Sequence, residues 1–119
     1  IFISGQLPIT TDGKIISGKV MKDVSLEQAQ KAAEMSILNA LGQLKNACNG
    51  DLNKVKSCIR ISGYVNCLEN FSDHAKVING ASDLIAKIFS ANLHSRIAIG
   101  CNSLPLNACV EIESIFETV

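Results

Sequence analysis

A regular alternation of residue types between Val55 and Asn66 is the feature that most constrains the fold. One face of this segment carries Val55, Ser57, Ile59, Ile61, Gly63 and Val65. The other face carries Lys56, Cys58, Arg60, Ser62, Tyr64 and Asn66. A period of two residues predicts a β-strand with one apolar face. The second face is less polar than a solvated surface, which predicts that another subunit covers it.

Patterns of helical period lie on both sides of this strand. The first begins with the capping box Ser25-Leu26-Glu27-Gln28 and continues as an apolar stripe, at spacings of three or four residues, up to Cys48. Asn49-Gly50 is expected to end this helix, because glycine readily adopts the left-handed conformation found at helix C-termini. The small residues of the stripe suit packing on a sheet.

A second amphipathic stripe covers residues 77–89, with Asn70 or Ser72 as the expected N-cap. Gly80 lies inside this stripe and lowers the local helix propensity by about 1 kcal/mol. Either a tight packing contact or a functional bend would explain a glycine at this position.

The first residues are predicted to form short extended segments. Residues 1–6 fit a strand, residues 10–14 a turn and residues 15–16 a brief second strand. Ser4-Gly5 either ends the first strand or lets a ligand approach the backbone, because glycine has no Cβ.

Two further strands are predicted at residues 96–101 and 108–116, joined by a Leu104-Pro105-Leu106 turn. Strands and helices alternate along the chain, and the helices are long enough to cover one face of a mixed sheet. The sequence therefore predicts one α+β domain spanning residues 1–119, large enough to fold without a metal or a disulfide.

The charge balance argues against nucleic acid as the main partner. Eleven Lys and Arg residues balance eleven Asp and Glu residues, and aromatic residues make up only 4% of the chain. Nucleic-acid binding depends on a basic surface and often on aromatic stacking, and the sequence offers neither. Charged residues reach only 18% against 47% apolar residues, which predicts that part of the apolar surface is hidden in an oligomer.

The five cysteines have irregular spacings and form no CxxC pair, so no zinc or redox motif is predicted. We expect buried, reduced thiols and a reducing compartment, which is predicted to be the cytoplasm, with the mitochondrion as the alternative. The longest uncharged run, residues 97–110, is shorter than the roughly 18 residues needed to span a bilayer. No signal peptide is visible, and the start at Ile1 without Met predicts that the natural N-terminus is cut, processed or left out.

The last two strands each carry one ionisable group. Arg96 shares its face with Ala98 and Gly100, which are small and are expected to leave room for an anion. Glu111 lies within the other strand, and a cation and a carboxylate on paired strands would bind a small anion and position a water. A solvent-facing arginine and an edge-strand glutamate remain the open alternative.

Other ionisable residues offer less. Arg60 is either a second anion site or a solvated or paired arginine of its strand. His74 and His94 lie 20 residues apart without a nearby ligand set, so each is expected to be a surface or cap histidine and not catalytic.

Several of these motifs occur together in one known family. Ile3-Ser4-Gly5-Gln6-Leu7-Pro8, followed by Arg96 with Leu104-Pro105 and then Val110-Glu111-Ile112-Glu113, resembles the Rid (YjgF) family of reactive-intermediate deaminases, also described as endoribonucleases of the L-PSP type. Asn79-Gly80-Ala81-Ser82-Asp83-Leu84 resembles a less studied branch of that family.

The resemblance implies a chorismate-mutase-like α+β fold assembled as a homotrimer. The three sheets would face inward as a barrel, with the helices outside and a cleft between each pair of subunits. The family has an N-terminal strand with a cleft tyrosine before the position of Ile1, so that segment is expected to be missing here.

The resemblance also implies an activity, which is hydrolysis of 2-aminoacrylate-type enamine and imine acids to a 2-keto acid and ammonia. Arg96 matches the carboxylate-binding arginine and Glu111 the glutamate that holds the attacking water, while the backbones of Ala98, Ser4 and Gly5 would line the cleft. No metal or cofactor is implied. Well-studied members carry cysteine at the position of Ala98, a departure that favours an alternative, a trimeric module that binds a small carboxylate without turnover. An endoribonuclease is a further alternative, opposed by the neutral charge and the absence of a histidine pair.

Overall fold

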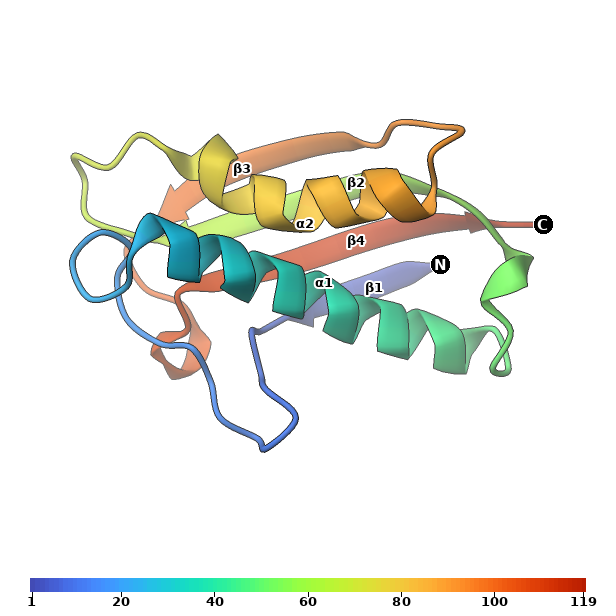
Figure 1. Cartoon of the computed structure of the whole chain (residues 1–119), viewed down its shortest axis with the longest axis horizontal. Helices are drawn as coiled ribbons and strands as arrows, with labels where there is room; N and C mark the ends of the chain where they lie inside the picture. Colours follow the sequence, from blue (N-terminus) through green and yellow to red (C-terminus); the bar gives the residue numbers. More distant parts are fainter.

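The computed structural model describes residues 1–119 as a four-stranded sheet with two helices on one face (Figure 1). The strands are β1 (Phe2–Gln6), β2 (Val55–Asn66), β3 (Ser95–Cys101) and β4 (Val110–Thr118), and their order in the sheet is β1-β4-β2-β3. β3 pairs with β2 in parallel, and the other two pairings are antiparallel. Helix α1 (Leu26–Ala47) covers β1 and β4, and α2 (His74–Ile88) covers β2 and β3. The predicted α+β fold with a mixed sheet is therefore confirmed.

The prediction that the last two strands pair with each other is wrong. β3 and β4 lie on opposite sides of β2, and the connection between them passes through a short 3₁₀ turn, Pro105–Asn107. β2, α2 and β3 form a crossover unit that makes β3 parallel to β2, and this occupies one side of β2. β4 then fills the other side, in antiparallel register.

Helix α1 begins as its sequence predicts. The Ser25 hydroxyl accepts a hydrogen bond from the Gln28 backbone at 3.1 Å, and the Gln28 side chain accepts one from the Ser25 backbone at 2.9 Å. After the helix, both Asn49 (φ 53°) and Gly50 (φ 85°) adopt the left-handed conformation, so the chain reverses over two residues.

Helix α2 begins one or more residues later than expected. Its N-cap is Asp73, whose side chain makes no capping hydrogen bond, so neither Asn70 nor Ser72 caps it. Of the two explanations for Gly80, packing is the correct one. A Cβ at this position would lie 2.0 Å from the Gln30 carbonyl oxygen of α1, so only glycine permits this approach of the two helices.

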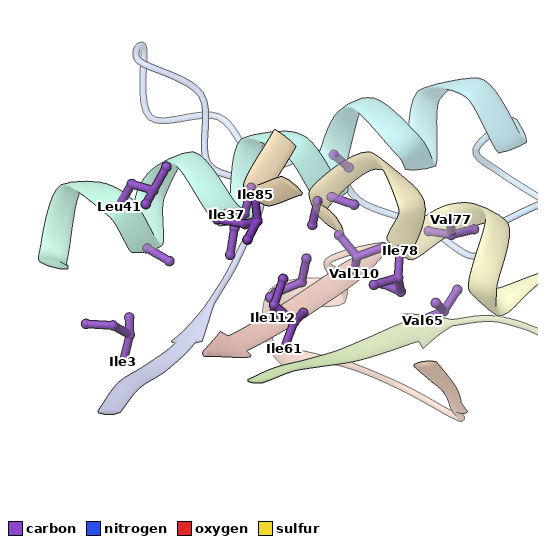
Figure 2. Packing of buried hydrophobic residues seen from close by; sticks show 14 of the residues in the cluster. Ile3, Ile37, Leu41, Ile61, Val65, Val77, Ile78, Ile85, Val110 and Ile112 are labelled. Carbon is purple, nitrogen blue, oxygen red and sulfur yellow. The ribbon is translucent and has the colours of Figure 1, made fainter. Parts of the chain in front are cut away.

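The core lies between the helices and the sheet (Figure 2). Its fully buried side chains include Ile37, Ile61, Ile78, Ile85, Ile112 and Phe116. The alternation of β2 is interrupted by a bulge, because Cys58 pairs with Phe116 and Arg60 with Ile115, leaving Ile59 without a partner. Ile59 is consequently 45% exposed and Cys58 takes the predicted buried place.

Residues 7–24 form an irregular segment in which the predicted brief strand is absent. Ile15 makes only an isolated bridge to Ile9, although residues 10–14 do form the predicted turn. Four of the cysteines are buried as predicted, and Cys101 is partly buried. Neither helix combines the length and apolar character that crossing a lipid bilayer requires.

Candidate functional site

Arg96 projects from β3 toward α2, on the helix-covered face of the sheet. Its strand neighbours Ile97 and Ile99 are each 40% exposed on the opposite, open face. Ala98 and Gly100 share the face of Arg96, as predicted, but they do not leave room there. Ala98 packs against the core, and a Cβ on Gly100 would lie 2.7 Å from His74 Nε2. These residues are small because α2 and the segment before it lie over them.

The guanidinium of Arg96 is held by α2 through a single nitrogen. Nη1 donates to Asn79 Oδ1 at 2.7 Å and to Ser82 Oγ at 3.2 Å. Nε and Nη2 donate to no group of the chain. Together these two nitrogens form one planar edge of the guanidinium, the arrangement that binds a carboxylate through two parallel hydrogen bonds.

His94 extends the same network. Its Nε2 lies 2.9 Å from Ser82 Oγ, and its Nδ1 is buried without a partner. Burial lowers the pKa of His94 below its usual value, and the nearby Arg96 guanidinium lowers it further. His94 is therefore not the surface or cap residue that the sequence indicated. The sequence held no signal for this contact, because His94 precedes β3 and its approach to Ser82 depends on how α2 packs over the sheet.

The free edge of the sheet runs beside this arginine. The Cys101 carbonyl accepts a hydrogen bond from the Cys67 N–H at 3.3 Å, so the backbone of Cys101 faces β2. Because backbone groups alternate along a strand, the N–H groups of Ala98 and Arg96 point away from β2, toward the unpaired edge of β3. The backbone of Ala98 is thus available to a ligand at this edge.

Glu111 lies on the open face of the sheet, because its neighbours Val110 and Ile112 are fully buried under the helices. The register between β1 and β4 is irregular between Ile3 and Gln6, so Ser4 and Gly5 form a bulge. A Cβ on Gly5 would lie 2.7 Å from Glu111 Oε1. The structure therefore brings Gly5 and Glu111 together, with Ser4 next to Gly5 in the bulge, and the bulge glycine makes space for the carboxylate.

Two further polar groups accompany Glu111 on the open face. The Tyr64 hydroxyl donates to Glu113 Oε1 at 3.2 Å. Desolvation raises the pKa of Tyr64, and the negative charge of Glu113 raises it further. Arg60 points to this face as well, without an ion pair, and its role as a second anion site stays a prediction.

The two residues of the predicted catalytic pair are not neighbours within one chain. Ile61 of β2 lies opposite Arg96, and Tyr64 of β2 lies opposite Glu111. Two strand spacings and three residues of offset separate the Cα atoms by roughly 14 Å. The side chains also point to opposite faces of the sheet. One chain therefore carries two partial sites, one around Arg96 and one around Glu111.

Comparison with known proteins identifies the family to which this chain belongs. The family described as "YjgF/chorismate mutase-like, putative endoribonuclease" matches residues 1–117. The chain belongs to the YjgF/chorismate mutase-like family. Its resemblance to Rid proteins is thereby confirmed.

Similar members of the YjgF family come from distant organisms. Protein TCP17 of Trypanosoma cruzi is 34% identical over 119 residues, which cover 98% of this chain and 74% of that protein. The crystal structure of Atu1372 from Agrobacterium tumefaciens, a protein of unknown function, superposes with a TM-score of 0.95 at 45% identity, covering 98% of this chain and 75% of that one. The crystal structure of a protein from Shewanella oneidensis, described as "a putative endoribonuclease", superposes with a TM-score of 0.91 at 34% identity, covering 98% of this chain and 77% of that one.

Proposed function

We propose that the protein is a homotrimeric hydrolase that converts small 2-imino acids and their enamine forms, such as 2-aminoacrylate, to 2-keto acids and ammonia. The observation that carries this proposal is the Nε–Nη2 edge of the half-buried Arg96, which donates to no group of the chain while α2 holds Nη1, on the edge strand of the sheet. A planar donor pair of this kind is complementary to a carboxylate.

The residues supply each requirement of the reaction. Arg96 holds the substrate carboxylate, and the Ala98 N–H at the strand edge offers a further donor. Glu111 accepts a proton from water as the water oxygen bonds to the imine carbon. Glu111 then returns this proton to the amino nitrogen of the carbinolamine. Ammonia leaves as the C–N bond breaks, and the hydroxyl proton passes to solvent as the carbonyl forms. The protonated imine is electrophilic enough that the step needs no metal or cofactor.

The separation of Arg96 and Glu111 favours a site shared between copies. The open sheet face exposes Ile59, Ile97 and Ile99 by 40–45%, an apolar surface of the kind that subunits cover. Packing this face against the β3 edge of a second copy would place Arg96 of one chain near Glu111 of another. The trimer and its inward-facing sheets follow the family resemblance.

The decisive experiment generates 2-aminoacrylate with a pyridoxal-phosphate-dependent dehydratase and follows the release of keto acid. Micromolar protein should accelerate this release, and Arg96→Ala should remove the acceleration while the oligomer persists in size-exclusion chromatography. If the wild-type protein produces no acceleration, the deaminase assignment for this substrate is wrong.

A second candidate is a module that binds a small carboxylate without turnover. It is favoured by one observation, that the Arg96 binding edge is complete within a chain while Glu111 lies on the opposite face. Carboxylate-dependent increases in melting temperature without product formation would identify this function.

An endoribonuclease is named in the family description and for the Shewanella structure, but the charge and geometry of this chain do not favour that activity. The formal net charge is zero, and the two histidines lie apart, His74 beside Cys67 and His94 beside Ser82. RNA cleavage that persists in Arg96→Ala and Glu111→Ala preparations would indicate contamination. The reducing compartment, cytoplasmic or mitochondrial, stays a prediction from the buried thiols.

A further inference from the structure

The hydrogen bonds of Arg96 are distributed unevenly over its three nitrogens. Nη1 carries two N–H groups, and Asn79 Oδ1 and Ser82 Oγ accept one each. Nη1 therefore has no hydrogen left for a ligand. The two acceptors fix the rotation of the guanidinium plane, and the Nε–Nη2 edge is the part that remains for a carboxylate.

Ser82 can hold Nη1 well only if its own hydroxyl proton points elsewhere. A hydroxyl has one proton to donate, and the Ser82 oxygen is already an acceptor from Arg96. His94 Nε2 lies 2.9 Å away and accepts this proton in the tautomer that carries its own proton on Nδ1. A hydroxyl that donates becomes a better acceptor, so this bond strengthens the one from Arg96.

We propose that Ser82 and His94 are positioning residues, which act as a relay from the imidazole through the hydroxyl to Nη1 and thereby present the Nε–Nη2 edge of Arg96 to a carboxylate ligand. This inference rests on the proposed carboxylate site at Arg96. Neither residue touches the substrate. In this arrangement His94 is neutral, its Nδ1 carries the proton, and its Nε2 is the acceptor.

The relay predicts different effects for two amide substitutions of His94. In His94→Gln, the amide oxygen can reach the place of Nε2 and accept the Ser82 proton. In His94→Asn, the shorter side chain reaches only the place of Nδ1. The first variant should keep the relay and the second should lose it, together with Ser82→Ala. Ser90→Ala, at an exposed serine beyond α2, is a matched control.

The ligand test uses pyruvate, a 2-keto acid product of the proposed reaction, titrated by calorimetry. Ser82→Ala and His94→Asn should weaken pyruvate binding roughly threefold to tenfold, while His94→Gln and Ser90→Ala stay within about twofold of wild type. In the turnover assay the same variants should raise KM and leave kcat nearly unchanged. Equal affinities in His94→Gln and His94→Asn would overturn the relay.

A second measurement needs neither ligand nor turnover. In ¹⁵N NMR spectra, the Nη1 and Nη2 groups of an arginine give separate signals when rotation about the Cζ–N bonds is restrained. Arg96 should show separate signals in the wild type and in His94→Gln, and averaged signals in Ser82→Ala and His94→Asn. Averaged signals in the wild type would overturn the relay. Separate signals with no pyruvate binding would instead refute the carboxylate site and leave the relay standing.

Discussion

The candidate role of Arg96 depends on the residues that contact its guanidinium as well as on its charge. The sequence identified Arg96 and Glu111 as functional candidates because charged groups are unusual on half-buried strands. It did not identify Asn79, Ser82 and His94, because the placement of α2 over β3 depends on packing that no local pattern encodes. The sequence therefore predicted the charged residues of the candidate site but not the contacts that orient them.

Asn79 offers a direct test of the anion site at Arg96. Replacing it by aspartate would put a carboxylate where Oδ1 lies 2.7 Å from Nη1, so the protein would carry its own anion. We expect Asn79→Asp to weaken pyruvate binding about tenfold or more, because the positive charge is neutralised. Asn79→Ala should weaken it only about threefold, since it removes one neutral acceptor. Calorimetric titration distinguishes the two, and stronger binding by Asn79→Asp would contradict the site.

Gly5 tests the position of Glu111. In Gly5→Ala the added Cβ would lie 2.7 Å from Glu111 Oε1, the far end of a flexible side chain that can move aside. Thermal unfolding should therefore change little, whereas the displaced carboxylate should lower kcat by roughly 10- to 100-fold. Unchanged turnover in a folded Gly5→Ala protein would exclude Glu111 from the reaction.

At the scale of the elements, local sequence patterns predicted well which helices and strands exist, but they predicted poorly which strands pair. Both helices and the long strand β2 appear where their periodicities placed them, and the capping box of α1 is present. The bulge at Ile59 and the order β1-β4-β2-β3 were not predicted. Two strands that follow each other along the chain can always be read as a hairpin. β3 and β4 lie apart because β3 pairs with one side of β2 and β4 pairs with the other.

The contact between α1 and α2 can be tested with a pair of glycines. Gly80→Ala would place a Cβ 2.0 Å from the Gln30 carbonyl oxygen, a backbone atom that cannot move without shifting α1. We expect the free energy of unfolding to fall by about 2–4 kcal/mol. Gly42→Ala is the control, because its Cβ would meet nothing within 4 Å on the exposed side of α1. It should raise the free energy of unfolding by about 0.5–1 kcal/mol, as alanine favours helix. Urea unfolding measures both, and similar effects of the two substitutions would refute the packing role of Gly80.

At the scale of the whole molecule, one face of the sheet is covered and the other is open. The sequence predicted this asymmetry from the weakly polar second face of β2, and the exposed isoleucines of β3 agree with it. It did not predict that Arg96 and Glu111 would be on different faces, because in β3 the small residue Ala98 packs against the core while Ile97 and Ile99 face outward. The proposed shared site follows from this division.

Mixed oligomers test the sharing directly. Arg96→Ala and Glu111→Ala should each be inactive alone. Unfolded together and reassembled, random trimers should regain activity in about a quarter of their sites, where an intact arginine meets an intact glutamate from another chain. Simple mixing without reassembly is the control. If both residues served the same site from one chain, no activity would return.

Buried thiols should make the stability of the fold depend on alkaline pH. Burial raises the pKa of Cys58 and of Cys109 from the usual 9.0 to about 11. Their stabilising contribution is complete below pH 9, because both states are then protonated. It is lost as the pH rises toward 11, since the unfolded chain ionises first. Urea midpoints should fall over this range, and the double variant Cys58→Ala, Cys109→Ala should show a flatter dependence. Equal slopes would mean that other groups cause the decline.

The placement of Arg96 and Glu111 on opposite faces has a consequence for regulation. If the site is shared, a dissociated chain lacks half of the site and cannot catalyse the reaction. The rate per chain then depends on the protein concentration. Dilution below the dissociation constant of the assembly would switch the activity off without any inhibitor. A cell that makes slightly more of this chain would then gain more than a proportional increase in rate, so that abundance itself acts as the effector.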